Sequence, residues 1–400
     1  MAERVYLHVG TPKTGTSGFQ HALFTQRKEL AAAGVTYPAD RFDGQFLAAL
    51  DLMDLPWGGL EREASGAWDR LTAEANSARG RVIISHEILG RASRMQVDRA
   101  LSSLDGEAHI VVTARDLARQ LPAEWQENVK HRRTIRYADF LDALRDPGRS
   151  REIAQWFWGV QELPDILDRW GGSLPPERVH VVTVPPPGSP RTLLGDRLAA
   201  TLGLDAAVLH TTGDRANASL GVAESALIRA LNERLDVVLP NKHYRQFVRE
   251  SLVHQNLGVT RESARLTLPP DVHAWATEVS RSWVEVLAGR GYTVAGDLEE
   301  LVPAAQTLPF VDPDHPDPEQ LSQVGLRALA ASVLESARLR DVEVELHEVI
   351  DDLMRQLDEA HLTKLYRTRE RLVSFADSNP VAKAGLAGYR RLRGRNSRPT

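Results

Sequence analysis

Short apolar runs alternate along the first half of the chain with longer segments whose apolar residues recur at helical spacing. The runs cover residues 4–9, 81–85, 109–113 and 178–184. Continuous runs rich in valine and isoleucine are typical of parallel strands that are buried on both faces, and the helical segments supply the crossovers between them. The pattern therefore predicts an α/β fold in which helices flank a parallel sheet.

The second half of the chain has a helical pattern with one interruption. Residues 216–289 have leucines at helical spacing and are expected to pack against the sheet. Five prolines then crowd residues 303–318, where they remove backbone donors and helical dihedral angles. Residues 302–318 are therefore predicted to be a proline-rich linker that follows an α/β domain of residues 1–301.

A narrow apolar seam marks residues 319–378. Its members step by three and four positions: Leu339, Val342, Leu346, Val349 and Leu353. Such a seam requires a second helix, so we predict a helical C-terminal appendage that pairs within the chain or across a homodimer. Residues 379–400 contain six lysines and arginines without an acid, and we expect a disordered basic tail.

Composition narrows the classes of function. The 400 residues carry 49 lysines and arginines against 54 acids, a net charge of −5, which argues against a nucleic-acid partner. The absence of cysteine excludes a disulfide framework, an iron–sulfur cluster, a cysteine nucleophile and a thiolate zinc site. The sequence has neither a signal peptide nor an apolar stretch of membrane-spanning length, so the expected location is cytoplasmic.

A strand, a glycine-bounded loop and the start of a helix follow one another near the N-terminus. Amides at the start of a helix bind phosphate, and Gly10 and Gly15 permit close approach of the backbone. In the Walker pattern G-x-x-x-x-G-K-[ST], these glycines and Ser17 would fit, but Thr16 stands where the lysine belongs. The lysine stands inside the loop as Lys13, which suits a shorter anionic chain than a nucleoside triphosphate.

The residues of this loop resemble the 5′-phosphosulfate loop of sulfotransferases that use 3′-phosphoadenosine 5′-phosphosulfate (PAPS), whose pattern is close to P-K-[TS]-G-T-[TS]. The matching residues are Pro12, Lys13, Thr14, Gly15, Thr16 and Ser17. In that family the lysine contacts the 5′-phosphosulfate and assists departure of the phosphate, while amides and hydroxyls hold the nucleotide. The resemblance implies a P-loop-like sheet, a catalytic Lys13 and PAPS as co-substrate bound by these residues.

A second element of the family is a strand that ends in an arginine which, with a serine eight residues later, binds the 3′-phosphate. Here the strand at 109–113 leads to Arg115, which can grip a phosphate through two N–H groups. Ala123 stands at the position of the serine, so one donor to the nucleotide is missing. Gln120, Gln126 or a backbone amide are candidate replacements.

The strand at 81–85 ends in His86 and Glu87, where similar enzymes position a general base. The acceptor must lose a proton as the sulfur is attacked, so a base within hydrogen-bond reach is required. Ser85-His86-Glu87 resembles the Ser-x-Glu of bacterial members, which favours Glu87, with His86 as the alternative.

Weaker signals complete the set of candidates. The loop with Arg215, Asn217 and Ser219 precedes a helix where related bacterial enzymes close over the nucleotide, although an N-cap role explains Asn217 or Ser219 equally well. Residues 124–133 have the composition of an acceptor cleft or of a solvated helix. Trp156 and Trp158 are either sugar-stacking or packing residues.

Together these features predict a PAPS-dependent sulfotransferase that transfers the sulfuryl group, without a metal, to a hydroxyl or amine of an unidentified acceptor. A glycan, a glycolipid and a small natural product are all compatible with the sequence. A divergent P-loop kinase that uses ATP and magnesium is one alternative. A nucleotide-binding scaffold without catalysis is another, and Ala123 is the best argument for it.

Overall fold

A computed structural model describes residues 2–209, 219–236, 238–259, 262–362, 364–379, 381 and 385 of the chain. It contains two compact units, Met1–Ala328 and Leu329–Thr400. In the part of the chain that the structure describes, no helix is both long and apolar enough to cross a lipid bilayer.

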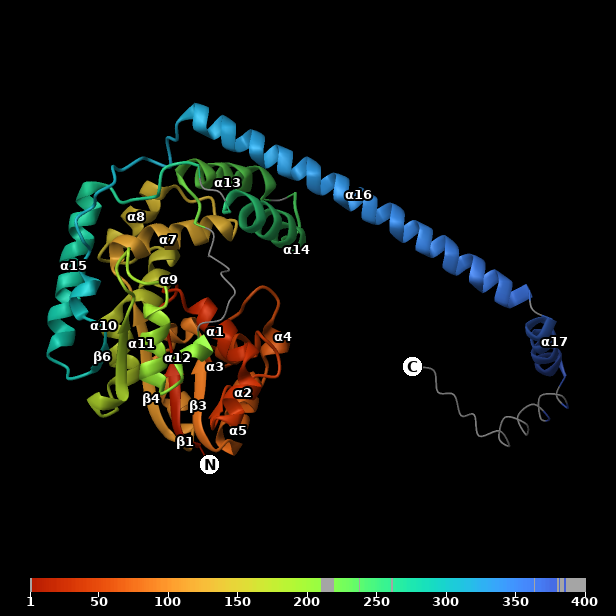
Figure 1. The fold of residues 1–400 in the computed structure, drawn as a ribbon, viewed down its shortest axis with the longest axis horizontal. Helices are drawn as coiled ribbons and strands as arrows, with labels where there is room; N and C mark the ends of the chain where they lie inside the picture. The colour runs from red at the N-terminus through yellow and green to blue at the C-terminus, as the bar shows by residue number, and fades with distance from the viewer. Residues whose placement is uncertain are drawn as a thin grey trace. The chain divides into compact units, whose positions relative to one another are not determined.

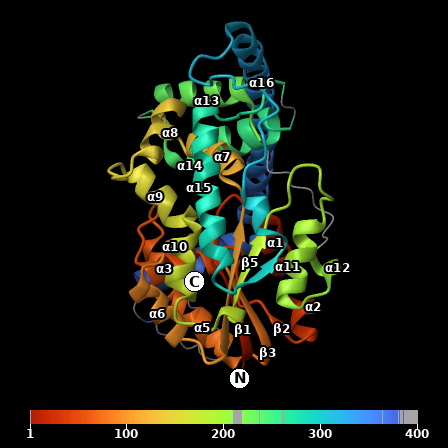
Figure 2. The same cartoon turned by 90° about the vertical axis from the view of Figure 1, so that its left-hand side faces the viewer.

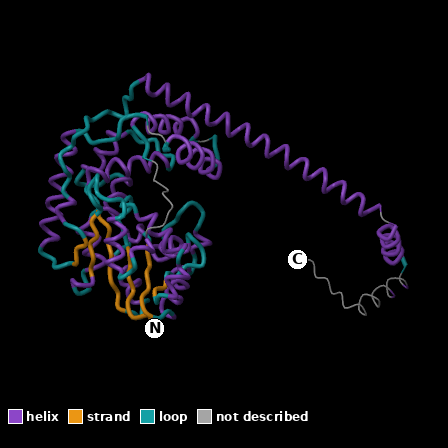
Figure 3. The backbone as a smooth tube through the Cα atoms, viewed as in Figure 1, coloured by secondary structure: helices purple, strands orange, loops and turns teal. Residues whose placement is uncertain are grey.

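Six parallel strands form one sheet in the first unit (Figures 1 and 3). The strands are β1 (Ala2–His8), β2 (Val35–Thr36), β3 (Gly80–Ser85), β4 (Glu107–Ala114), β5 (Val179–Thr183) and β6 (Thr293–Ala295). Their order across the sheet is β2-β3-β1-β4-β5-β6, so β1 lies between β3 and β4. The predicted class, a P-loop-like α/β fold with a parallel sheet, is confirmed.

The N-terminal half of the first unit supplies these helical segments: α1 (Thr16–Thr25), α2 (Arg27–Ala32), α3 (Gly44–Met53), α4 (Glu61–Ala64), α5 (Ala67–Ser77), η1 (Glu87–Arg91), α6 (Arg94–Ser102), α7 (Leu117–Lys130), α8 (Tyr137–Arg145), α9 (Glu152–Gln161), α10 (Leu163–Gly171) and η2 (Pro176–Arg178). The remaining segments are α11 (Leu193–Leu202), α12 (Ala206–Leu209), α13 (Val222–Leu235), α14 (Asn241–His243), the π-helical η3 (Tyr244–Leu257), α15 (Pro270–Ala288), η4 (Leu298–Leu301), α16 (Pro318–Leu362) and α17 (Lys364–Ser378).

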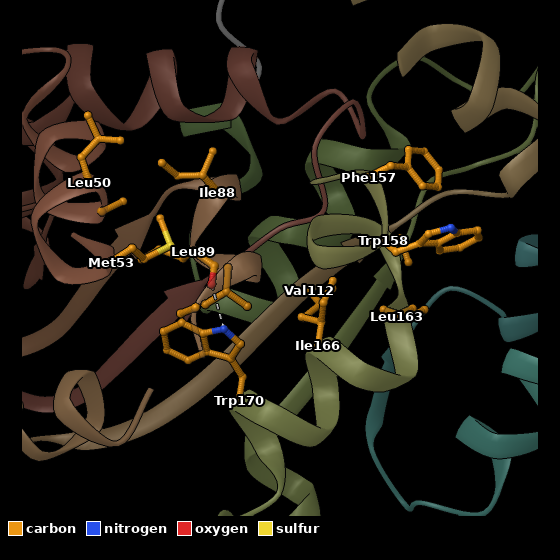
Figure 4. Packing of buried hydrophobic residues seen from close by; sticks show 14 of the residues in the cluster. Leu50, Met53, Ile88, Leu89, Val112, Phe157, Trp158, Leu163, Ile166 and Trp170 are labelled. Atoms are coloured by element: carbon orange, nitrogen blue, oxygen red, sulfur yellow. Dashed lines mark hydrogen bonds between the residues drawn. The ribbon is translucent and has the colours of Figure 1, made fainter. Parts of the chain in front are cut away.

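Helices cover both faces of the sheet, because alternate side chains of each strand point to opposite faces. Val5 and Leu7 of β1 join a large apolar cluster that includes buried residues of α3, α5, α7 and α10, whereas Tyr6 joins a second cluster with residues of α1, α2 and α11. Figure 2 shows α3, α5 and α10 on one side of the strands and α2 and α11 on the other. In the larger cluster the indole N–H of Trp170 donates to the carbonyl oxygen of Leu89 at 3.0 Å, as Figure 4 shows.

The proline-rich segment 302–318 packs along the first unit. The buried carboxylate of Asp314 accepts hydrogen bonds from the backbone N–H groups of Tyr137 at 3.0 Å and Ala138 at 2.9 Å, and so caps the start of α8. The hydroxyl of Thr267 donates to the carbonyl oxygen of Pro309 at 3.2 Å. Prolines prevent a helix here but not packing, and the structural division follows Ala328 instead of falling inside the expected linker.

Candidate functional site

The loop between β1 and α1 is shaped by three residues with positive φ. Gly10 has φ +141°, Lys13 has φ +62° and Gly15 has φ +85°. A Cβ on Gly10 would meet the carbonyl oxygen of Glu87 at 3.2 Å, so both its conformation and its surroundings favour glycine. Gly15 is the N-cap of α1, and because it has no side chain, no cap covers the first amides of the helix. Exposed amides at this position attract anions.

The far side of this loop is tied to the end of β4. The backbone N–H of Thr11 donates to the carbonyl oxygen of Thr113 at 2.8 Å, and that of Thr113 donates to Gly10 at 2.7 Å. The Thr14 hydroxyl donates to the carbonyl oxygen of Thr11 at 2.6 Å and lies 2.7 Å from the Thr113 hydroxyl. Thr14 is therefore a buried support of the loop; Thr16 is also buried, whereas Ser17 is exposed.

Lys13 faces α7. Its Nζ lies 2.6 Å from Oε2 of Glu127, and the lysine side chain is 29% exposed. Glu127 also pairs with His131 at 3.0 Å and lies 3.7 Å from Arg249 of η3. Burial acts to raise the pKa of Glu127, but the hydrogen bonds and charges of His131 and Lys13 outweigh it and hold that pKa far below its usual range. Glu127 is therefore an anion that neutralises the loop lysine.

Arg115 is linked to the same loop through one glutamine. Its Nε donates to Oε1 of Gln120 at 2.8 Å, and the amide of Gln120 donates to the carbonyl oxygen of Pro12. Arg115 Nη2 also donates to the carbonyl oxygen of Arg119 at 3.0 Å. Desolvation lowers the pKa of Arg115 to about 10, which leaves the guanidinium charged at neutral pH.

The two glutamines proposed as replacements for the missing serine are both engaged in hydrogen bonds within the fold. Gln120 joins Arg115 to Pro12, and Gln126 is buried, with its amide donating to the carbonyl oxygen of Leu220. Ala123 itself is half-buried on α7. A phosphate beside Arg115 would therefore depend on Arg115 and backbone amides.

Glu124 also lies beside the loop, although it was not among the predicted site residues. Positions 120, 124 and 127 share one face of α7, and the contacts of Gln120 and Glu127 show that this face meets the loop. Glu124 is buried, and its Oε2 has no hydrogen-bond partner among the described residues. Burial raises the pKa of Glu124 to about 7 against the opposing charge of Lys13. Helical spacing places position 124 on the same face as Gln120, but only the packing shows that this face meets the loop.

The end of β3 brings Glu87 and His86 to the same edge of the sheet. Glu87 accepts a hydrogen bond from Nε2 of Gln20 on α1 at 2.9 Å. Burial acts to raise its pKa, but His86 and Gln20 together hold the pKa below its usual value. His86 Nδ1 accepts from the backbone N–H of Ile88 at 3.3 Å, and its ring stacks on Phe46. Burial lowers the pKa of His86.

A second histidine lies beneath this edge. His8, the last residue of β1, is fully buried, with Nδ1 2.8 Å from the Ser85 hydroxyl and Nε2 3.2 Å from the Thr113 hydroxyl. Burial lowers the pKa of His8 to about 4, so the ring is neutral at physiological pH. It links the ends of β1, β3 and β4, a role that was not predicted.

The other predicted residues lie apart from this constellation or outside the described chain. Arg215 and Asn217 fall outside the described residues, and Ser219 is exposed. The N-cap of α13 is Gly221, so the N-cap reading of Ser219 is wrong. Trp158 is a buried packing residue whose indole N–H donates to Leu144 at 3.0 Å. Among the described residues, no three His, Asp or Glu side chains are grouped to hold a metal ion.

The fold and the loop thus define a P-loop-like α/β protein in which the ends of three parallel strands and helix α7 bring a lysine, an arginine and three carboxylates to one region. The positions of Lys13, Arg115 and Glu87 near the carboxyl ends of β1, β4 and β3 agree with the general placement of ligand sites in open α/β sheets.

Comparisons with known proteins do not define the class of this protein more narrowly. No family model matches the chain, and no curated protein matches it. Among solved structures, the crystal structure of a sulfotransferase from Alicyclobacillus acidocaldarius is similar, with 16% sequence identity and a TM-score of 0.37. The match covers 61% of this chain and 100% of that one. A likeness at this level carries no argument about activity, which must come from the residues.

Proposed function

We propose that this protein is a sulfotransferase that moves the sulfuryl group of PAPS to a hydroxyl or amine of an acceptor. The observation that supports the proposal is the loop from Pro12 to Ser17, which combines a lysine of positive φ with the uncapped amides at the start of α1. The Lys13 side chain is held against α7 by an ion pair and is not directed into bulk solvent.

In the proposed step, an acceptor oxygen or nitrogen attacks sulfur while the bond from sulfur to the bridging oxygen of the 5′-phosphate breaks. The acceptor's proton passes to a carboxylate, and 3′-phosphoadenosine 5′-phosphate leaves with the electron pair. Lys13 and the α1 amides would neutralise charge that develops on the leaving phosphate. Catalysis would then rest on positioning and electrostatics, with Lys13 exchanging Glu127 for the nucleotide.

Two carboxylates are candidates for the proton acceptor. Glu87 follows from the resemblance, but its bond to Gln20 and its low pKa make it a weak base. Glu124 has a free oxygen among the described residues and a pKa of about 7, which suits proton transfer near neutral pH. His86 is less suited, because its Nδ1 caps η1.

Two alternatives compete with this proposal. The glycine spacing favours a divergent kinase that uses ATP and magnesium, but Thr16 at the lysine position opposes it. Ala123 and the engaged Gln120 favour a nucleotide-binding scaffold without catalysis.

Isothermal titration calorimetry separates these functions. We expect 3′-phosphoadenosine 5′-phosphate to bind and ATP with magnesium not to bind. Lys13→Ala should weaken nucleotide binding roughly 10- to 100-fold, because a charged hydrogen bond is lost. Lys28→Ala, which removes an exposed lysine from α2, is the matched control and should leave affinity unchanged.

The opposite preference, for ATP with magnesium, would establish the kinase alternative. Binding of the adenosine bisphosphate without consumption of PAPS across a broad panel of hydroxyl and amine acceptors would favour the scaffold.

A further inference from the structure

The long helix α16 presents an apolar face that nothing in the described part of the second unit covers. Within Leu329–Thr400 the face is formed by Val342, Leu346, Val349, Leu353 and Leu357, whose side chains are 37–58% exposed. Figure 3 draws α16 as one unbroken helix. Spacings of three and four residues keep the five side chains on one side, which is the pattern of a helix that pairs with another helix.

Charge changes sign along the second unit. Residues 341–359 of α16 contain eight acids and one arginine, whereas α17 contains four lysines and arginines and two acids. In a parallel, in-register pair the acidic stretches of two copies would lie side by side and repel. An antiparallel pair instead brings the basic helix of each copy towards the acidic stretch of the other.

The link between the two helices disfavours the same arrangement within one chain. α16 ends at Leu362 and α17 begins at Lys364, so a single residue separates them. Antiparallel helices of one chain are ordinarily joined by two to five residues. The basic helix that complements α16 must therefore come from another molecule.

We propose that a second copy of this chain covers the α16 face in an antiparallel, two-fold symmetric dimer. In an antiparallel pair the C-terminal end of each α16 points towards the N-terminal end of the other. α17 of one copy, with Arg369 and Arg371, therefore lies towards the acidic stretch of its partner, which contains Glu343 and Glu345. Both copies use the same surface, so the assembly closes as a dimer. The inference is independent of the sulfotransferase proposal.

Sedimentation equilibrium of the full chain at micromolar concentration tests this assembly. We expect a dimer. Leu346→Glu together with Val349→Glu should raise the dimer Kd about 100-fold or more, because unpaired carboxylates would be buried in the seam. Val344→Glu is the matched control: Val344 is also exposed on α16 but lies off the seam, so this variant should remain dimeric. Circular dichroism checks that each variant keeps its helix content.

Charge exchange tests the orientation. Arg369→Glu with Arg371→Glu should weaken the dimer about tenfold, and adding Glu343→Arg with Glu345→Arg should restore it. In a parallel dimer these positions do not meet, so a failure of the second exchange to restore affinity would overturn the antiparallel arrangement. A full chain that sediments as a monomer, or a dimer insensitive to the changes at Leu346 and Val349, would overturn the proposal as a whole.

Discussion

At the scale of single residues, the site is built on compensated charge. Lys13 is neutralised by Glu127, and Glu127 is shared with His131 at 3.0 Å. Glu124, on the same helix face, is held in a buried position where ionisation is disfavoured. An anionic ligand that entered this cluster would replace one carboxylate and oppose the ionisation of the other.

Removing the competing carboxylate should favour an anionic ligand. Glu127→Gln is expected to tighten binding of 3′-phosphoadenosine 5′-phosphate about three- to tenfold, because the nucleotide no longer competes with an ion pair for Lys13. Calorimetry measures this change. Glu250→Gln, on neighbouring η3, serves as a control for charge alone. Weaker binding in Glu127→Gln would mean that Glu127 positions Lys13 for the ligand.

The raised pKa of Glu124 makes a prediction about stability and pH. A carboxyl with a folded-state pKa of about 7, above its unfolded value of 4.5, favours the folded state most below pH 4.5, and that contribution is lost as the pH rises through 7. Glu124→Gln should therefore stabilise the protein by about 2–3 kcal/mol at pH 8.5 and by little at pH 5. Urea unfolding at the two pH values measures the difference, and equal effects at both would contradict it.

At the scale of elements, the junction between β4 and α7 determines what a phosphate could meet. Asp116 caps α7, accepting a hydrogen bond from the N–H of Arg119 at 2.9 Å, and fixes the first turn of the helix beside Arg115. Gln120 then connects this turn to the lysine loop. One helix therefore contacts both Arg115 and the lysine loop, the two proposed anion contacts.

This junction should discriminate between nucleotides. Arg115→Ala is expected to weaken binding of 3′-phosphoadenosine 5′-phosphate roughly tenfold or more. It should have little effect on binding of adenosine 5′-phosphate, which lacks the 3′-phosphate. Ala123→Ser should have the opposite effect: it should tighten binding of 3′-phosphoadenosine 5′-phosphate by about two- to tenfold and leave binding of adenosine 5′-phosphate unchanged. Competition calorimetry with both nucleotides checks the pair. Equal changes in affinity for both nucleotides would mean that Arg115 does not contact the 3′-phosphate.

At the scale of the whole molecule, the sequence predicted features that are contiguous along the chain and missed those created by packing. The strands β1, β3, β4 and β5 and the loop from Pro12 to Ser17 are local patterns, and the structure has them where expected, whereas the short edge strands β2 and β6 were not predicted. The role of Glu124 depends on which face of α7 meets the loop, and that of Asp314 on a contact with α8 at a separation of 177 residues. Neither is visible in local periodicity.

The contact of Asp314 with α8 shows that the proline-rich segment 302–318 belongs to the first unit. Asp314→Ala should destabilise that unit by about 2–4 kcal/mol, because two backbone N–H groups lose a buried charged acceptor. All eight tryptophans precede position 284, so their fluorescence during urea unfolding reports on the first unit alone. Asp341→Ala, on the exposed surface of α16, should leave the transition in place. An unchanged midpoint for Asp314→Ala would mean that the segment is dispensable.

The ion pair between Lys13 and Glu127 should also affect which anions bind when many small anions are present. A small anion such as inorganic phosphate gains one ammonium but must displace a carboxylate already seated there, so the exchange yields little free energy. A ligand that also reaches Arg115 obtains a second cation, which donates hydrogen bonds to the neutral oxygens of Gln120 and Arg119. We therefore expect the protein to bind little inorganic phosphate at concentrations that would saturate an unpaired lysine. A ligand that contacts both Lys13 and Arg115 should bind at those concentrations.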